Sequence, residues 1–327
     1  MKQGVKSLID KLDKYAESFK DEMRWEPQIC KMICSFMCVI TNIEPDVEKY
    51  KDMKQYIIEH TGAFSFFRGE ISPYIATMLM GVDDQEFTFD KFDYTYQLLR
   101  SKKFTGSEQL VCTSVLLADN INRADMDIIV EHFKDIYYVF GKLHPMNTCI
   151  DNYLGLATIA CSDFTLDEIP RHMRILESEL KSTVGGGNIL QTLVNALFMV
   201  KGDPMELAKR ARISYMTFKS NKYDFRWYGN IAMMGLLTSV DGDMTNIVYD
   251  VLEAAKYAEK LPNFSNLMMD TFDRLMIMIA VYIYDYCKYK LRSRNAMRDK
   301  TYYGDIISTM VLVLIVGLFA EEDLTRL

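Results

Sequence analysis

The sequence predicts an all-α fold made of stacked antiparallel helical hairpins of roughly 40 residues, forming an α-solenoid-like array. Three observations predict this class. Apolar residues recur at helical spacing along most of the chain. Two consecutive segments match each other at a constant offset of 40 residues. The 327 residues include only 16 glycines and 7 prolines, too few for a chain of many short strands and tight turns.

The repeat is clearest between the segments that begin at Asp203 and Asp243. At an offset of 40 residues, Leu207 falls on Ile247, Ala211 on Val251, Tyr215 on Ala255 and Phe218 on Ala258. This spacing marks one face of an α-helix. A glycine stands directly before each aspartate. We therefore expect a helix stop at the glycine and an N-cap at the aspartate, in a turn that joins a short apolar helix to a longer amphipathic one.

The same pattern predicts further helix pairs along the chain. In order, they are residues 28–40 with 46–59, 71–80 with 89–99, 106–118 with 126–140, 148–160 with 165–180, and 267–284 with 305–320. Thr165 and Glu168 have the spacing of a capping box at the start of one helix. We expect a repeat domain over residues 1–264, and C-terminal apolar helices over 265–327 that close the same domain.

Charge and cysteine content indicate which partners are unfavourable and in which compartment the protein is expected. Lys plus Arg is 38 and Asp plus Glu is 45, a net charge of -7. This balance does not favour nucleic acid as a partner. Seven cysteines at irregular spacing fit reduced thiols better than a disulfide framework. The first residues carry charges and no apolar secretory segment. We therefore expect a cytoplasmic protein.

Two apolar stretches near the C-terminus raise the question of a membrane. Residues 275–284 and the run from Ile306 to Ala320 are uncharged, and a basic segment, residues 288–300, lies between them. A spanning helix needs about 20 apolar residues, so both runs fall short. Buried helices are the favoured interpretation. Membrane association through residues 306–320, with the basic segment on lipid headgroups, is the alternative.

Three segments resemble an uncharacterised bacterial family catalogued as domain of unknown function 4003. They are Phe64-Ser65 after a helix end, the helix over residues 71–79, and the string from Asn188 to Leu193, Asn-Ile-Leu-Gln-Thr-Leu. The resemblance runs from about the N-terminus to about Leu261. It implies an all-helical, cytoplasmic bacterial protein and supplies no catalytic residues.

No complete catalytic or metal motif is present in the sequence. Cys30, Cys34 and Cys38 share one helix face, but structural zinc needs a second ligand pair, so core packing is the better interpretation. The four histidines belong to no zinc-protease string. We therefore predict no catalytic residues, no metal and no cofactor, and we favour a protein that is not an enzyme.

Four residues are candidates for ligand binding. Arg68 follows a phenylalanine-rich turn, Asn188 and Gln191 begin a helix after three glycines, and Trp227 precedes another helix. Asn188 and Gln191 are three residues apart, so we expect both to face one cleft. The sequence favours a helical-repeat binding or scaffolding protein with a protein or peptide partner. The alternative is a small-molecule or nucleotide-binding protein, including an enzyme, with a polar pocket between repeats.

Overall fold

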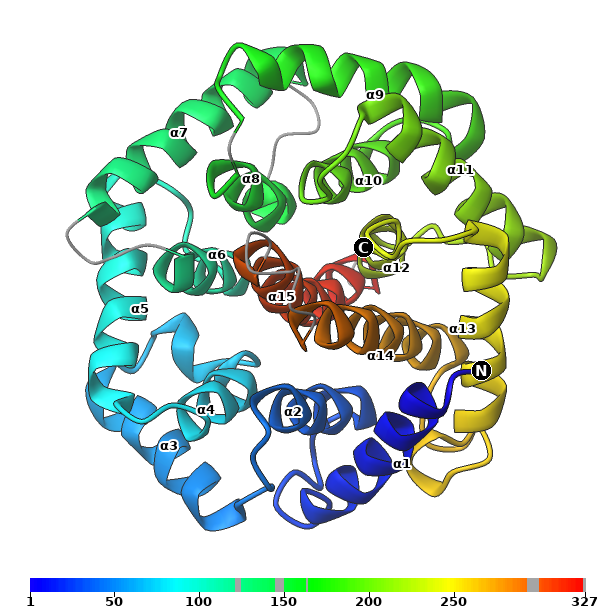
Figure 1. The fold of residues 1–327 in the computed structure, drawn as a ribbon. Helices are drawn as coiled ribbons and strands as arrows, with labels where there is room; N and C mark the ends of the chain where they lie inside the picture. Colours follow the sequence, from blue (N-terminus) through cyan, green and yellow to red (C-terminus); the bar gives the residue numbers. More distant parts are fainter. Residues whose placement is uncertain (121–124, 145–149, 163, 293–299, 326–327) are drawn as a thin grey trace. The chain divides into compact units, whose positions relative to one another are not determined.

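The structure is a computed structural model that describes residues 1–120, 125–144, 150–162, 164–292 and 300–325 (Figure 1). Within this part the chain forms fifteen α-helices and no β-strand, which confirms the predicted all-α class. The helices are α1 Gln3–Ser18, α2 Gln28–Thr41, α3 Val47–His60, α4 Ser72–Met80, α5 Gln85–Ser101, α6 Glu108–Asn120, α7 Met126–Leu143, α8 Tyr153–Ala160, α9 Glu168–Val184, α10 Asn188–Phe198, α11 Pro204–Ser220, α12 Tyr228–Leu237, α13 Met244–Ala258, α14 Thr271–Arg292 and α15 Lys300–Thr325.

The helices group into two compact units. Unit 1 comprises residues 1–91 and 249–285, and unit 2 comprises residues 92–248 and 286–327. The chain passes from one unit to the other inside α5, α13 and α14. The segment from residue 265 onward, expected to act as one closing element, is therefore shared between the two units.

Unit 1 contains α1, a helix that the sequence patterns had not indicated. Its apolar face, including Val5, Ile9 and Leu12, is buried, and α1 packs on α2. Helix α2 packs on α4, and α4 on α3. The amide of Asn263 binds Asp13 Oδ1 at 2.9 Å, which ties the segment after α13 to α1. Tyr284 of α14 stacks edge-on against Phe36 of α2.

Unit 2 has two layers of helices and one further helix against the inner layer. Neighbouring inner helices pack in the order α6, α8, α10, α12, whereas α9 and α11 pack together on the outside (Figure 1). Helix α15 packs on α6, α8 and α12. The inner helices of unit 2 are therefore covered by the chain's own C-terminal helix.

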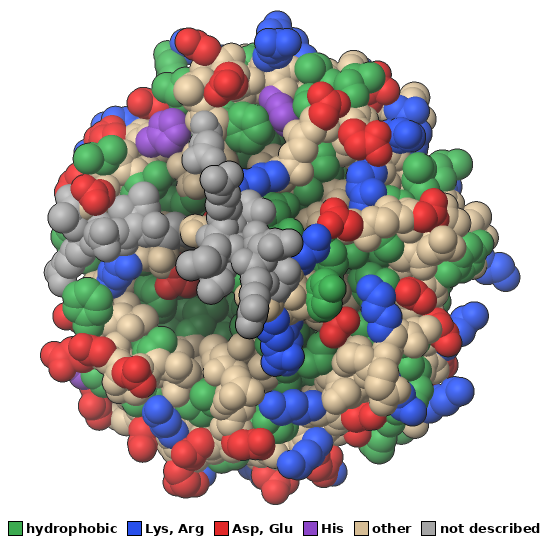
Figure 2. All heavy atoms as spheres, in the orientation of Figure 1, with side chains coloured by type: hydrophobic (Ala, Val, Ile, Leu, Met, Phe, Trp, Pro, Cys, Tyr) green, Lys and Arg blue, Asp and Glu red, His purple; other side chains and the backbone are tan. Residues whose placement is uncertain are grey.

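The short helices of unit 2 are buried over nearly their whole surface, and the long ones on one face only. Every residue from Gly229 to Leu237 of α12 is buried, while α9 buries only Ile169, Met173, Leu176 and Leu180. The acidic and basic side chains that remain outside are interspersed over both units (Figure 2). This mixed surface offers no broad region of one charge on the face shown.

The pairing of helices differs from the expected hairpins by one helix. We expected each short apolar helix to pair with the long helix that follows it. Instead α3 packs more extensively on α4 than on α2, and α7 more on α8 than on α6. Short and long helices alternate along the chain. Pairing each short helix with the long helix before it or after it fits this order equally well, so the sequence could not distinguish the two pairings.

The two Gly-Asp turns have matching geometry. Asp203 accepts hydrogen bonds from the amides of Met205 and Glu206, at 3.0 and 3.2 Å. Asp243 accepts one from the amide of Asn246 at 2.9 Å. Gly202 and Gly242 both have positive φ, 154° and 123°. Both aspartates are therefore N-caps, as predicted. Of the predicted capping box only the glutamate half forms: Glu168 accepts from the amide and hydroxyl of Thr165, but the Thr165 hydroxyl does not cap the helix, which begins at Glu168 with Asp167 at the N-cap position.

Helix α15 corrects the length argument about the membrane. The apolar run from 306 to 320 is short, but the helix that contains it spans Lys300–Thr325. Among the described residues, Thr301–Phe319 is the one helical stretch long and apolar enough to cross a membrane, with mean hydropathy 1.9 and 67% of its window buried. Asp305 lies inside the helix instead of bounding it. Arg294 and Arg298 of the basic segment lie outside the described residues.

Close contacts at glycine hold the inner helices of unit 2 together. A Cβ built at Gly317 of α15 would lie 2.7 Å from the Cα of Gly229 in α12. A Cβ at Gly235 of α12 would lie 2.8 Å from the Cβ of Ala196 in α10. The backbones therefore approach more closely than any larger residue would permit.

Replacing Gly317 by alanine should destabilise the protein by about 1–3 kcal/mol, because the added methyl meets backbone in α12 and forces the two helices apart. Gly304→Ala is the matched control on the same helix, since a Cβ there meets nothing within 4 Å. It should be neutral or stabilising by up to about 1 kcal/mol through helix propensity. Chemical denaturation of both variants measures the difference. Equal stability of the two would show that α15 does not pack on α12 in this way.

Candidate functional site

Arg68, the first sequence candidate, completes the end of a helix in unit 1. It lies in the 3-10 helix Phe66–Arg68. Its Nε donates to Thr61 Oγ1 at 3.0 Å, and its guanidinium also binds the carbonyl oxygens of Ile58 and Thr61. These carbonyls end α3 and would otherwise lack donors. Nearby Phe67 is buried, whereas Phe64 is fully exposed. The guanidinium is therefore engaged by the protein's own backbone.

Asn188 and Gln191 do not face one cleft, contrary to the expectation. Asn188 is exposed at the first turn of α10, whereas Gln191 is 3% exposed. Gln191 Nε2 donates to Asn195 Oδ1 at 2.9 Å, and Asn195 Nδ2 donates to Asn152 Oδ1 at 3.0 Å. This buried amide chain links α10 to the start of α8. Side chains three residues apart lie only about 60° apart around a helix, and here the boundary between solvent and core falls between them.

Trp227 and the cysteine row have different environments. Trp227 is 43% exposed and precedes α12. Cys30, Cys34 and Cys38 are buried in α2, with Cys34 Sγ 3.7 Å from the carbonyl oxygen of Pro73. Burial raises the pKa of the Cys38 thiol to about 12. No group of three potential metal ligands occurs among the residues that the structure describes.

A hollow with mixed polar and apolar walls lies in unit 2, and we call it the α10–α15 cavity. Its volume is about 570 Å³, within the usual range for small-molecule sites. It is lined by Leu116, Thr158, Cys161, Ser162, Phe164, Glu168, Phe198, Met199, Val200, Lys201, Gly202, Thr301, Tyr302, Asp305 and Thr309. These residues come from α6, α8, α9, α10, α15 and the loops beside them.

One wall of the cavity is aromatic. The rings of Phe164 and Phe198 meet edge-on at 5.2 Å, and His172 packs against both, at 4.7 and 5.1 Å. Burial lowers the pKa of His172, although the charges of Asp203 and Glu168 act in the opposite direction. The imidazole is therefore mainly neutral at pH 7, and the wall presents rings without a fixed charge.

Helix α15 contributes Thr301, Tyr302, Asp305 and Thr309 to the lining of the cavity. Thr309 is 1% exposed, and its Oγ1 has no hydrogen-bond partner within the described residues. An unpaired buried hydroxyl costs about 1–3 kcal/mol. Thr158 and Ser162, also in the lining, satisfy their hydroxyls on the carbonyls of Gly155 and Ile159. Thr309 therefore offers a hydrogen bond that the protein leaves unused.

Lys201 and Tyr302 close one end of the cavity. The backbone amide of Lys201 donates to Tyr302 Oη at 3.3 Å, and its Nζ lies 5.0 Å from the centre of the same ring. Burial raises the pKa of Tyr302 to about 12, so the hydroxyl stays protonated at pH 7. Likewise burial, followed by the charge of Asp305, raises the pKa of Cys161 to about 12. Neither group is a nucleophile in this state.

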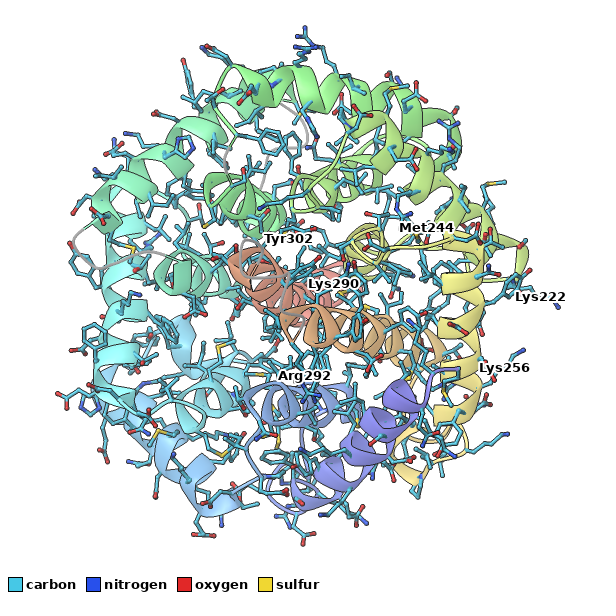
Figure 3. The ribbon with its side chains drawn as sticks, in the orientation of Figure 1. Lys222, Met244, Lys256, Lys290, Arg292 and Tyr302 are labelled. Atoms are coloured by element: carbon cyan, nitrogen blue, oxygen red, sulfur yellow. The ribbon has the colours of Figure 1, made fainter. Side chains whose placement is uncertain are left out.

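A row of tyrosines continues from this end of the cavity. Tyr302 contacts Tyr303 at 5.1 Å between ring centres, and Tyr303 contacts Tyr286 at 6.1 Å. Lys290 lies over Tyr286 and pairs with Asp241 at 2.7 Å. Figure 3 shows Lys290 on α14 and Tyr302 on α15. The row anchors the start of α15, and so fixes the position of Tyr302.

Sequence reasoning missed this cavity because its lining residues are scattered over five helices and the loops beside them. One available signal was Thr309, a polar residue within the apolar run 306–320. A lone threonine in an apolar helix usually bonds its own backbone, as Thr113 does with the carbonyl of Gln109. Only the fold shows that the Thr309 hydroxyl does not bond to its own helix backbone.

The chain belongs to the DUF4003 family. Residues 14–316 match the family described as "Protein of unknown function (DUF4003)", nearly the whole chain. The match extends beyond Leu261, where the sequence resemblance had been expected to end, and includes α14 and most of α15. No curated protein and no solved structure matches the chain at a significant level.

Proposed function

We propose that this protein is a helical-repeat binding protein whose unit 2 takes a small molecule in the α10–α15 cavity. The observation that carries the proposal is the unpaired Thr309 hydroxyl in the wall of a 570 Å³ hollow. A ligand with a polar atom at this point would satisfy the hydroxyl, while the rings of Phe164 and Phe198 would cover an apolar body. We also propose that the protein is cytoplasmic, because seven cysteines at irregular spacing fit reduced thiols better than a disulfide framework.

The proposal is for binding, with no catalytic step assigned. The pKa values of Cys161 and Tyr302 keep both groups protonated, so neither supplies an anionic nucleophile or base at pH 7. Chemically, the cavity combines hydroxyl donors, one lysine and an aromatic wall. This combination suits a small amphiphilic molecule with one polar end.

A thermal-shift screen of organic acids, amino acids and nucleosides tests the proposal. We expect at least one ligand to raise the melting temperature, because a ligand that binds only the folded state stabilises it. The same ligand should have little effect on Thr309→Val, an isosteric change that removes the unpaired hydroxyl and leaves the unliganded protein at least as stable.

Thr113→Val is the matched control, because Thr113 is equally buried in unit 2 and does not line the cavity. It should retain the ligand response of the wild type. No shift with any compound, or an undiminished shift in Thr309→Val, would contradict the proposal.

A protein or peptide partner is a second proposal, with its binding surface on the outside of unit 2. Met205 and Met216 of α11 are 50% and 53% exposed, and their spacing of eleven residues places them on one helix face. Exposed methionines suit adaptable binding surfaces. The inner face is the less suitable surface, because α15 covers α6, α8 and α12. Loss of a captured partner on joint Met205→Lys and Met216→Lys substitution would support it, and unchanged capture would refute it.

A further inference from the structure

A second, smaller hollow in unit 2 shares no residue with the α10–α15 cavity, and we call it the lysine hollow. Its volume is about 290 Å³. It is lined by Lys102, Lys103, Phe104, Thr105, Lys134, Asp135, Tyr137, Tyr138 and Tyr153. Its walls come from the loop that follows α5, from α7 and from α8. Three lysines, three tyrosines and one aspartate therefore meet around a space of small-ligand size.

The charges of the lysine hollow are only partly balanced. Lys102 and Lys134 both pair with the carboxylate of Glu131. Lys103 has no ion pair with any described residue. With Asp135 in the lining as well, three lysines stand against two carboxylates, which leaves one positive charge in excess. An anion in the hollow would be attracted by these ammonium groups.

Lys103 and Lys222 have the same backbone geometry after a helix but different surroundings. Both lysines follow the end of a long helix in the left-handed conformation, with φ of 74° and 73°. In both, the next residue's amide bonds back five residues, Phe104 to Leu99 and Tyr223 to Phe218. A cation suits any helix C-terminus. However, Lys222 lines neither of the two hollows and extends away from its unit (Figure 3), whereas Lys103 lines the lysine hollow together with two further lysines.

The tyrosines add hydrogen-bonding groups and a flat surface. Tyr153 Oη accepts from the amide of Thr105 at 3.2 Å, which holds the loop after Lys103 in place. Tyr138 is 63% exposed, and Lys142 Nζ lies 4.2 Å from its ring centre. Tyr153 is packed edge-on against Phe104 and Tyr137. The hollow therefore has a rigid aromatic base and an accessible basic edge.

We propose that the lysine hollow binds the phosphate group of a small phosphorylated molecule. Lysine binds phosphate as a point charge, and a phosphate dianion gains more than a carboxylate from several ammonium groups because its charge is larger. Tyrosine and threonine hydroxyls can donate to the remaining oxygens. The volume lies at the lower limit for ligand sites, roughly 300 Å³, which favours a compact anion. The proposal does not depend on the ligand of the α10–α15 cavity.

Isothermal titration calorimetry of the full chain at low salt tests this inference, with pyrophosphate, AMP and acetate as probes. We expect pyrophosphate to bind, acetate to bind more weakly, and added salt to weaken both. Binding of AMP as well as pyrophosphate identifies phosphate as the recognised group. Tighter binding of AMP than pyrophosphate would assign a contribution to the adenine ring, still anchored by phosphate.

Three substitutions locate the site. Lys103→Gln and Lys134→Gln should each weaken pyrophosphate binding by about fivefold. Asp135→Asn should strengthen pyrophosphate binding by about twofold, because it removes a negative charge that repels the anion. Lys222→Gln is the matched control and should leave binding unchanged. Circular dichroism of each variant shows that it is folded.

Two results would overturn the inference. One is the absence of measurable pyrophosphate and AMP binding to the wild-type protein at millimolar concentration. The other is binding that Lys103→Gln and Lys134→Gln leave unchanged, or that Lys222→Gln weakens equally.

Discussion

The packing of α15 on the inner helices of unit 2 is the contact on which the rest of the account depends. From Thr309 to Val316 every residue of this helix is at most 6% exposed, so it is buried on all sides and not on one stripe. Its contact with α12 is made where Gly317 meets Gly229, with no side chain between the two backbones. An apolar helix of this length resembles a membrane span by composition, and here the protein itself supplies the apolar surroundings.

The position of α15 also determines which surfaces remain for binding. Its polar residues Tyr302, Asp305 and Thr309 form one side of the α10–α15 cavity. Without the helix, the inner faces of α6, α8 and α12 would be an open groove of the kind that helical-repeat proteins offer to peptides. With the helix in place, unit 2 has a cavity at this position, and its open surfaces are the outer helices and the lysine hollow. This is why we propose a small molecule, and not a peptide, as the ligand of the inner side.

Much of the fold could be predicted from sequence because its signals are local. Helical periodicity, the Asp203 and Asp243 caps and the contact of Glu168 with Thr165 depend on residues within one or two turns. Pairing of the helices and the extent of α15 could not be predicted in this way. Asp305 reads as the end of an apolar run, yet it lies within the helix, because one carboxylate at the edge of a cavity does not interrupt backbone hydrogen bonding.

The candidate site was predicted poorly for the opposite reason, since it depends on contacts between distant residues. Gln191 and Arg68 are polar residues near helix ends, a common setting for ligand binding. In this fold, Gln191 satisfies Asn195, and Arg68 satisfies the carbonyls that end α3. Nothing in their local sequence distinguishes a polar group that serves the protein's own backbone and amides from one that awaits a ligand. Thr309 is the opposite case, because its local sequence suggests a hydroxyl bonded to the backbone, whereas the fold leaves that hydroxyl unpaired.

Hydrogen exchange of α15 tests the central claim most directly. If the helix is part of the core, the amides of residues 306–316 should exchange only through global unfolding, as slowly as those of α10 and α12. This protection should be the same with and without lipid vesicles. Rapid exchange of these amides in solution, or protection that appears only when vesicles are added, would contradict the account.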